Sequence, residues 1–330
     1  MRVLMLAHRW TPAHNAGAEV MVQAMLRALV ERGHDVDVTL SDQSGEPYVI
    51  DGVRVWPGRD PKALIPGAGI LVTHLQQTPT AMMLGRWHRL PVVQVWHNNL
   101  DVTKRWASGA ALGVANSEWM WWDFDPFEEQ TPPMIVVRPP VVAADYATTP
   151  GDRVTLINLR PDETSPDGVV LGKGAELFWR LAEMLPDVQF LGVKGAYGEQ
   201  MVRDLPNVEV IEHVPHDRMR DEVYARTRVL LVPSSYESWG RVAVEAMSSG
   251  IPVVAHPTPG LKESCGRDGI YAHRDRIDQW LSQLDWLLEP DMWQLMSEAA
   301  RCRAAELDPT EDLNRWCDAV EALALEGVPR

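Results

Sequence analysis

The sequence predicts an α/β protein made of two doubly wound domains. Three observations lead there: the 330 residues exceed one ordinary domain, short apolar runs alternate with helical patterns, and the same alternation restarts after a polar segment near residues 143–152. The first domain is expected over residues 1–147 and the second over 148–330. Alternation of this kind produces parallel sheets that are covered by helices on both faces.

The first part of the chain establishes the alternation. Residues 2–7, RVLMLA, form a continuous apolar run, as expected of a strand buried on both faces. A loop follows, residues 18–33 then place apolar side chains at helical spacing, and Gly33 ends the helix. Residues 35–40 are the next strand. The opening residues, MRVLMLAHRW, are too short and too polar for a signal peptide, which favours a cytoplasmic location.

The remaining elements follow in the same order. In the first domain, strands are expected at 69–75, 91–97 and 111–117. The second domain begins with a strand at 153–159 and a helix at 174–185, and further strands are expected at 188–195, 208–214, 229–234 and 252–256. From about residue 276 the pattern is helical, and these last helices are expected to pack back on the first domain. Ligands of such folds bind at the carboxyl ends of strands, so the cleft between two facing domains is the expected site.

Composition limits the classes of partner. The net charge of −15 argues against nucleic acid, because phosphate binding needs concentrated Lys and Arg. No run approaches the roughly 18 uncharged apolar residues that a membrane helix needs, so no integral membrane association is expected. The oligomeric state cannot be predicted from these features.

Residues 234–254, SSYESWGRVAVEAMSSGIPVV, contain two acids eight positions apart. The preceding apolar run is a buried strand, so Glu237 lies in the loop at its carboxyl end. Glu245 lies on the helix that follows, near its first turns. Gly240 allows a ligand close to the backbone, and free N–H groups at the helix start favour an anion such as phosphate. From the spacing alone, the structural explanation is favoured, in which Glu237 is a surface loop acid and Glu245 is a first-turn acid stabilised by the helix dipole.

The sequence of this segment resembles the E-x7-E motif of retaining GT-B glycosyltransferases, particularly glycosyltransferase family 4. The match runs from Glu237 through ESWGRVAVEAMSSGIPVV, and the amino-terminal segment AGAEVMVQAMLRALVERGHDVDV resembles the family's small-residue loop and first helix. The resemblance covers nearly the whole chain. It implies the GT-B fold, in which two Rossmann-like domains face each other across a cleft.

The resemblance also implies roles for these residues. Glu245 would hold the ribose of a nucleotide-sugar and Glu237 the hydroxyls of the donor sugar, because a carboxylate can accept two hydroxyl hydrogen bonds at once. The backbone between them would meet the phosphates, which makes the following residues part of the donor site: Ser238, Trp239, Gly240, Arg241 and Val242. Fixed donors aimed at the departing pyrophosphate lower the barrier, so neither a metal nor another cofactor is expected.

Cations near the phosphates are expected from the family's Arg and Lys after the first strand of the second domain. Lys173, followed by Gly174, matches the family pattern well and is expected to contact phosphate and to serve catalysis. Arg160 follows the strand, but the segment PDETSPDGVVLG separates it from Lys173. Either the loop carries an insertion or Arg160 is not the family arginine. The alternative for both is ordinary solvated charge.

Several positions outside the motif complete the expected site. The resemblance places His97, at the end of a strand, beside the donor sugar as a catalytic residue, and Gly17 at a close approach to the donor. Val214 resembles the segment whose backbone contacts the base, which leaves UDP and GDP sugars as the expected donors. Acceptor contacts are expected from His74, Asn98 and Asn99. A lone histidine is more often a structural hydrogen-bonding group. The tryptophans of residues 118–124 are either helix packing or a stacking platform.

The function that the resemblance implies is retaining, metal-independent transfer of a hexosyl-type sugar to an acceptor hydroxyl. The weak basic character of the first helix and the acidic chain favour a soluble acceptor: a sugar, a natural product or a protein. Two alternatives stay open: a GT-B nucleotide-sugar epimerase or phosphorylase, and a non-catalytic GT-B partner subunit.

Overall fold

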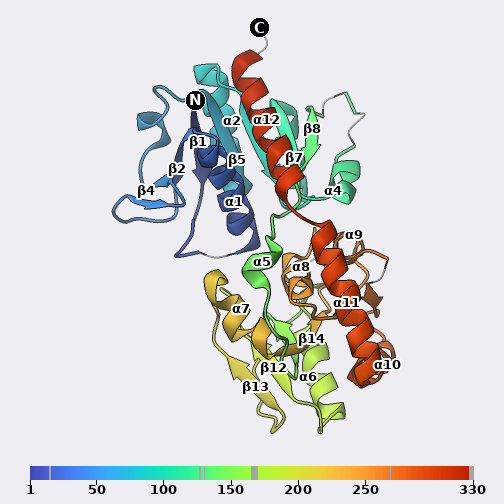
Figure 1. The fold of residues 1–330 in the computed structure, drawn as a ribbon. Helices are drawn as coiled ribbons and strands as arrows, with labels where there is room; N and C mark the ends of the chain where they lie inside the picture. Colours follow the sequence, from blue (N-terminus) through green and yellow to red (C-terminus); the bar gives the residue numbers. More distant parts are fainter. Residues whose placement is uncertain (15, 126–127, 130, 165–169, 268, 327–330) are drawn as a thin grey trace. The chain divides into compact units, whose positions relative to one another are not determined.

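The computed structural model describes residues 1–14, 16–125, 128–129, 131–164, 170–267 and 269–326. The chain divides into two compact units, Met1–Pro140 with Pro309–Arg330 and Val141–Asp308 (Figure 1). The division therefore falls between Pro140 and Val141, whereas the sequence predicted it after residue 147, and it returns the end of the chain to the first unit. Each unit is described by itself below.

The first unit contains an eight-stranded sheet in the order β3-β4-β2-β1-β5-β6-β7-β8. All neighbours pair in parallel except β3 and β4. From β1 the chain first adds strands on one side and then returns to the other side with β5, so the order reverses between β1 and β5. The strands are β1 (Arg2–Ala7), β2 (Asp35–Leu40), β3 (Tyr48–Ile50), β4 (Val53–Pro57), β5 (Ile70–His74), β6 (Val92–Trp96), β7 (Leu112–Ala115) and β8 (Met134–Val136).

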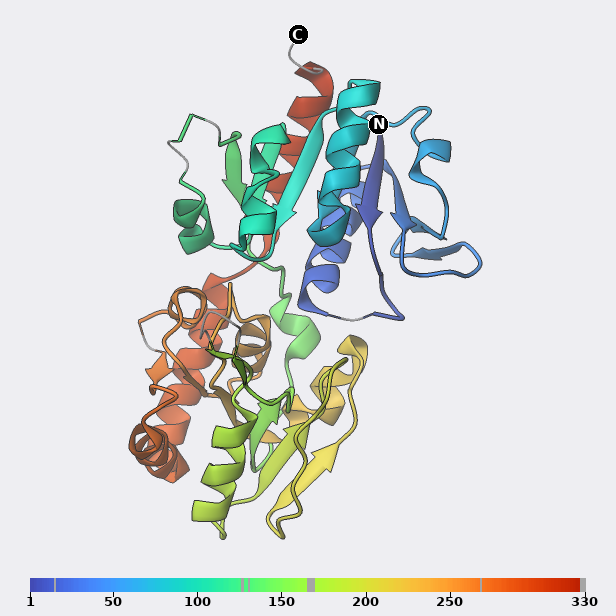
Figure 2. The same ribbon diagram turned by 180° about the vertical axis from the view of Figure 1, so that it is seen from behind.

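Helices cover both faces of this sheet because its central strands are apolar on both sides. Val3 and Met5 of β1 pack into the core formed with α1 (Gly17–Glu31) and α12 (Thr310–Glu326). Leu4 and Leu6 point to the other face and pack into the core that includes α2 (Thr78–His88). Figure 1 shows α1 and α12 on the near face of the first unit, and Figure 2 shows the face covered by α2. The continuous run RVLMLA is explained by this two-sided burial.

The return of the chain to the first unit rests on α12. The fully buried Trp316 donates its indole N–H to the carbonyl of Met25 on α1 at 2.9 Å. Asp312, also buried, accepts from the guanidinium of Arg138, with Nε 2.6 Å from Oδ2. Of the terminal helical region predicted to pack on the first domain, α12 does so, whereas α10 (Ile277–Leu288) and α11 (Pro290–Glu306) belong to the second unit.

The second unit contains a six-stranded parallel sheet in the order β13-β12-β9-β14-β15-β16. Helices α8 (Arg241–Ser248), α9 (Pro259–Cys265) and α11 cover one face, and α6 (Ala175–Met184) and α10 cover the other. The order reverses between β9 and β14, the two central strands. The strands are β9 (Arg153–Ile157), β12 (Phe190–Val193), β13 (Val208–Ile211), β14 (Thr227–Val232), β15 (Val253–Ala255) and β16 (Ile270–Tyr271). The remaining helices are α5 (Ala143–Tyr146) and α7 (Met219–Glu222).

Two smaller features bear on the predictions. Strands β10 (Glu163–Thr164) and β11 (Val170–Leu171) form a separate antiparallel pair between β9 and α6. In the first unit, α3 (Asp101–Lys104) and α4 (Glu118–Asp123) are short, and α4 carries the tryptophan cluster. Trp119 and Trp121 pack against a small core, while Trp122 is 59% exposed, so helix packing explains most of the cluster. Within the described residues, no helix has both the length and the apolar character required to span a membrane.

Candidate functional site

The loops that follow β9 and β14 bring Lys173 and Glu237 together. Strands β9 and β14 are parallel neighbours at the point where the strand order reverses, and loops there open a crevice in folds of this type. Lys173 directly precedes α6, and Glu237 lies in the loop after β14. The Lys173 Nζ lies 2.5 Å from the Glu237 Oε1 although the residues are 64 positions apart. Both side chains are partly exposed.

Backbone contacts between the two loops explain this approach. The N–H of Gly172 donates to Ser235 Oγ at 3.0 Å, and the N–H of Ser235 donates to the Gly172 carbonyl at 3.1 Å. Gly174 has φ +80°, and a Cβ there would lie 2.5 Å from the ring of Pro233. The absence of a Cβ at Gly174 therefore lets the Lys173 loop pack tightly against the β14 loop.

The β10–β11 hairpin lies in the long segment between Arg160 and Lys173. Glu163 pairs with Leu171, so this strand pair ends two residues before Lys173. Both interpretations of this loop, an insertion or an Arg160 that is not the family arginine, stay open. The Arg160 guanidinium is 3.0 Å from Glu163 Oε1 of the same hairpin. A contact of Arg160 with phosphate stays a prediction.

The turn into α8 is built around Gly240. Its φ of +91° suits glycine, and a Cβ would lie 2.5 Å from the side chain of Leu261. Trp239 is buried beside it, and the backbone of Ser238 passes so close to Gly260 that a Cβ there would lie 2.4 Å from the Ser238 carbonyl carbon. The sequence thus positions the first N–H groups of α8, which begins at Arg241, at the carboxyl edge of the sheet.

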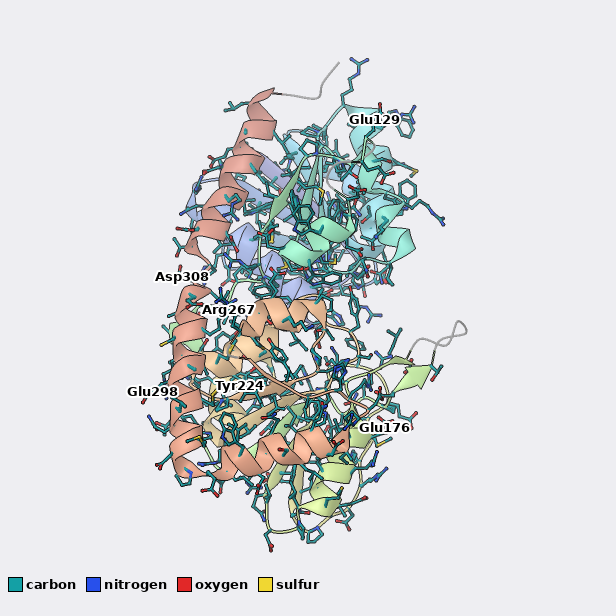
Figure 3. All side chains as sticks on the ribbon, turned by 90° about the vertical axis from the view of Figure 1, so that its right-hand side faces the viewer. Glu129, Glu176, Tyr224, Arg267, Glu298 and Asp308 are labelled. Carbon is teal, nitrogen blue, oxygen red and sulfur yellow. The ribbon has the colours of Figure 1, made fainter. Side chains whose placement is uncertain are left out.

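Glu245 is buried in this helix and held on both oxygens. The Tyr224 hydroxyl donates to Oε2 at 2.6 Å, and the Arg241 Nε donates to Oε1 at 2.5 Å. Tyr224, labelled in Figure 3, is itself fully buried. Burial, together with the nearby charge of Glu245, raises the pKa of Tyr224 well above its usual value, so this hydroxyl remains a donor.

A second layer of polar groups surrounds Arg241. Its Nη2 donates to the Tyr146 hydroxyl at 2.8 Å, and that hydroxyl lies 2.6 Å from Nε2 of His216. Burial, followed by the positive charge of Arg241, lowers the pKa of His216. The Arg241 Nη1 is buried and has no hydrogen-bond partner among the described residues. It is one donor in this cluster that a ligand could satisfy.

Sequence reasoning missed three members of this cluster: Tyr146, His216 and Tyr224. Tyr146 falls in the segment that the composition marked as a linker, and no pattern linked it to a helix about a hundred positions later. The side chain of Arg241 was also missed, because the resemblance assigned only its backbone. Val214, 5% exposed, packs into the apolar core on the same face of the sheet and offers only its backbone to a ligand.

In the first unit, the predicted His74 and His97 lie together at the ends of β5 and β6. His74 Nδ1 and His97 Nε2 are 3.1 Å apart. Burial lowers the pKa of His97 to about 4 and lowers that of His74 as well, so both rings are neutral near pH 7. Their proximity follows from the parallel pairing of β5 with β6, in which His74 faces Val95.

The other predicted residues of the first unit differ in what they offer. The Asn98 Oδ1 accepts from the N–H of Leu100 and from the Thr103 hydroxyl, so this oxygen holds a turn. Asn99 is half-buried. Gly17 is the first residue of α1, and a Cβ there would have no heavy atom within 4 Å. Neither backbone conformation nor packing therefore requires glycine at position 17, and the space beside it is open.

Two residues that the sequence did not single out stand next to this pair. His8 follows β1, and its Nε2 lies 3.9 Å from Oε1 of Glu19, the acidic residue in the first turn of α1. Glu19 is 1% exposed, and burial raises its pKa to about 7. The sequence predicted Gly17 at the start of this helix as a site residue but not Glu19. An acidic residue in the first turn of a helix is usually exposed, so its burial could not be recognised from the sequence.

Comparison with solved structures defines the class of fold. The sucrose-phosphate synthase of Thermosynechococcus elongatus superposes with a TM-score of 0.82 over 99% of this chain and 100% of that one, at 15% identity. An Anabaena protein solved in complex with UDP-glucose superposes with a TM-score of 0.74 over 98% of this chain and 100% of the other, at 17% identity. With its two Rossmann-like units, the chain has the GT-B fold.

Sequence comparison matches part of the chain to known glycosyltransferases. Residues 173–290 match the family model described as "Glycosyl transferases group 1". D-inositol 3-phosphate glycosyltransferases from Mycobacterium marinum and Mycolicibacterium gilvum are 30% and 31% identical over 47% and 57% of this chain. These matches span 38% and 45% of the two relatives, less than half of their length. The matched segment begins at Lys173 and includes both Glu237 and Glu245.

Proposed function

We propose that the chain is a retaining glycosyltransferase that moves a hexosyl-type sugar from a nucleoside-diphosphate sugar to a hydroxyl of a soluble acceptor. The observation that carries this proposal is the Lys173–Glu237 pair at the carboxyl ends of β9 and β14, within the segment that matches the glycosyltransferase family model. Lys173 and Glu237 are in direct contact with each other. Lys173 offers a positive charge for a phosphate, and Glu237 offers a carboxylate for sugar hydroxyls.

A bound donor would replace the contact between Lys173 and Glu237 with contacts of its own. In the proposed complex, Lys173 turns its ammonium group to the pyrophosphate, while the Glu237 carboxylate accepts hydrogen bonds from the transferred sugar. The first N–H groups of α8, beginning at Arg241, add positive potential at the phosphates. With these fixed donors, the departing charge is stabilised without a metal ion at the pyrophosphate.

Glu245 is proposed to hold the ribose diol, and its environment fits that role. A carboxylate has about four lone-pair sites, and Tyr224 and Arg241 occupy two of them. In the proposed complex, the ribose hydroxyls donate to the remaining lone pairs of this carboxylate. Because Tyr224 and Arg241 fix the carboxylate before the nucleotide arrives, little side-chain entropy is lost on binding.

The proposed reaction takes place on one face of the sugar. The bond between the anomeric carbon and the phosphate oxygen breaks, the acceptor oxygen forms the new bond from the same side, and its proton passes to the departing phosphate. No protein nucleophile takes part in this scheme. Glu237 and Lys173 contribute by holding the sugar and the leaving group, and His97 is proposed to orient the donor sugar.

The experiment has a binding arm and a product arm. Thermal shift and calorimetry with UDP, GDP, ADP, TDP and their sugars, each with and without EDTA, identify the donor, because a ligand of the folded state raises the melting temperature. Proton NMR of the product with a panel of sugar acceptors then reports the anomeric configuration. The proposal expects a nucleotide-dependent shift of the same size in EDTA, and a product with the donor's configuration.

Matched variants separate this site from surface charge. Lys194 and Glu212 form a second Lys–Glu pair in the same unit, with 2.6 Å between Nζ and Oε1 and Glu212 84% exposed. We expect Lys173→Met and Glu237→Gln to remove donor turnover and Lys194→Met and Glu212→Gln to leave it unchanged. Isomerised donor formed without acceptor would assign the chain to the epimerases instead. Absence of binding by any nucleotide would contradict the proposal.

A further inference from the structure

Three side chains converge at the point of the first sheet where the strand order reverses. His8 follows β1, His74 ends the neighbouring parallel strand β5, and Glu19 lies in the first turn of α1. One ligand atom from each, an imidazole nitrogen or a carboxylate oxygen, lies within 4.8 Å of the others. All three residues are buried, with exposed fractions of 8%, 0% and 1% for His8, His74 and Glu19.

Each of the three residues has a buried polar atom without a hydrogen-bond partner among the described residues. These atoms are Nδ1 of His8, Oε2 of Glu19 and Nε2 of His74. A buried polar atom without a partner costs about 1–3 kcal/mol, so folded proteins seldom retain several in one place. Their coincidence in one cluster indicates that these three residues contact a group absent from the polypeptide.

The pairing with His97 fixes which atom His74 presents. If the His74 Nδ1–H donates to Nε2 of His97, 3.1 Å away, the Nε2 of His74 carries a free lone pair. This is the atom of His74 that has no partner in the structure. Metal-binding histidines are commonly oriented in this way, with the second ring nitrogen donating to a neighbouring acceptor.

We propose that His8, Glu19 and His74 bind a divalent transition-metal ion of the zinc class. Two imidazoles and one carboxylate suit zinc, cobalt, nickel or ferrous iron better than magnesium or calcium, which take oxygen ligands. Three protein ligands leave at least one coordination position open to water or to an oxygen of a ligand. His14, with Nε2 4.0 Å from Oε2 of Glu19, lies at the edge of the cluster.

The geometry requires a modest closure. Two atoms that both lie about 2.1 Å from an ion cannot be more than about 4.2 Å apart. Nε2 of His8 and Oε1 of Glu19, 3.9 Å apart, already satisfy this limit, and the full set of three ligand atoms must contract by roughly 1 Å or less. Rotation of the imidazole and carboxylate groups supplies such a change without moving the strands.

The metal ion proposed here is not one of the groups proposed to stabilise the departing pyrophosphate. Lys173 and the start of α8 belong to the second unit, whereas the three ligands belong to the first. Metal binding here therefore does not depend on the proposed transferase activity, and the two can fail separately. The competing explanation is a metal-free cluster in which Glu19 holds a proton, with Arg9 as the nearby positive charge.

The test uses the full chain after treatment with a chelator. Co²⁺ is titrated and followed by its visible absorption, Zn²⁺ binding is measured by competition and calorimetry, and Mg²⁺ serves as the comparison ion. The proposal expects saturation at one Co²⁺ per chain, displacement by Zn²⁺, and a higher melting temperature with Zn²⁺ but not with Mg²⁺. Absence of saturable binding to the wild-type chain overturns it.

Variants locate the ion. Glu19→Gln keeps the shape of the side chain and His8→Gln changes the least buried histidine of the set, so one of them is expected to fold even if His74→Gln does not. Both should abolish the Co²⁺ spectrum, whereas His97→Gln should weaken binding about 10–100-fold by releasing the His74 ring. His88→Gln, at the exposed end of α2, is the control and should bind like wild type. Unchanged Co²⁺ binding by folded Glu19→Gln overturns the assignment.

Discussion

The hydrogen bond between Tyr224 and Glu245 offers a sharp test of how the second unit is held together. Tyr224→Phe removes only the hydroxyl, which donates to Glu245 Oε2 at 2.6 Å, and leaves the buried ring in place. Glu245 keeps its contact with Arg241 but loses its second donor inside the protein. The change therefore isolates one charge-assisted hydrogen bond without opening a large cavity.

The expected loss follows from the charge of the acceptor. A hydrogen bond to an ionised group contributes about 1.5–3 kcal/mol to stability, against about 0.5–1.5 kcal/mol for one between neutral groups. Tyr271 provides the neutral comparison in the same unit, since its hydroxyl donates to the carbonyl of Gly266 at 2.8 Å. We expect Tyr224→Phe to lower the free energy of unfolding by about 1.5–3 kcal/mol, and Tyr271→Phe by about 1 kcal/mol.

Equilibrium urea unfolding, followed by tryptophan fluorescence and circular dichroism, measures both losses. The midpoints should move while the slopes stay equal, because neither change alters the surface exposed on unfolding. Nucleotide affinity gives a second readout, which Tyr224→Phe should weaken and Tyr271→Phe should not. A smaller stability loss for Tyr224→Phe than for Tyr271→Phe would refute the claim that an ionised Glu245 is held by this hydroxyl.

Three further predictions concern the candidate donor site. Glu237→Ala should remove most turnover with an unchanged circular dichroism spectrum, and near wild-type donor consumption would contradict the assignment. Lys173→Met should weaken nucleoside-diphosphate binding about 10-fold to 150-fold in calorimetry, the equivalent of one lost charge-assisted contact, whereas equal affinities for Lys173→Met and Lys194→Met would count against a phosphate role. Because burial lowers the pKa of His216 below 6.5, its contribution to stability is complete above about pH 6.5 and is lost as the pH falls below it. His216→Gln should therefore show a shallower decline of the urea midpoint between about pH 7 and pH 5, and an identical decline would contradict this sign. The charged and titratable groups around this ring are Arg241, Glu245, Asp217, Asp145 and Tyr146.

The strands of both sheets could be predicted because burial on two faces leaves a clear trace in the sequence. The expected strand at 69–75 is β5, Ile70–His74, and the expected strand at 229–234 contains most of β14. The first helix also ends where Gly33 predicted, within two residues. Short strands at the sheet margins were not foreseen. Tyr48–Ile50 is only three residues long and partly exposed, so its pairing with β4 is what identifies it as a strand.

The position of the last helix could not be predicted in detail. The sequence shows helical periodicity from about residue 276 onward, but periodicity does not tell which core receives an apolar face. Trp316 places α12 on the core of the first unit. Its ring is buried beside α1, where the Met25 carbonyl accepts a hydrogen bond from its indole N–H. Such a partner, 291 positions away, is a tertiary fact that no local pattern contains.

In the candidate site too, the motif predicted the residues that are proposed to contact a ligand, whereas the contacts that hold those residues come from tertiary packing. The E-x7-E resemblance selected Glu237 and Glu245, and the family pattern selected Lys173. It did not reveal that Glu245 is anchored by Tyr224 and by the side chain of Arg241, because these contacts join segments with no shared motif. Family patterns record residues that meet a ligand, whereas the groups that hold those residues vary with the surrounding core.

The two polar clusters share one structural cause. In each unit, parallel neighbours on either side of the reversal in strand order end at the same edge, and their outgoing loops leave in opposite directions. Polar side chains on the connections that follow those strands are brought to this edge: Lys173 and Glu237 meet in the second unit, and His8 and His74 lie close together in the first. In the second unit the charges neutralise each other directly. In the first, two imidazoles and a buried carboxyl group present polar atoms that have no hydrogen-bond partner among the described residues, and a cation is a partner that such a set can bind.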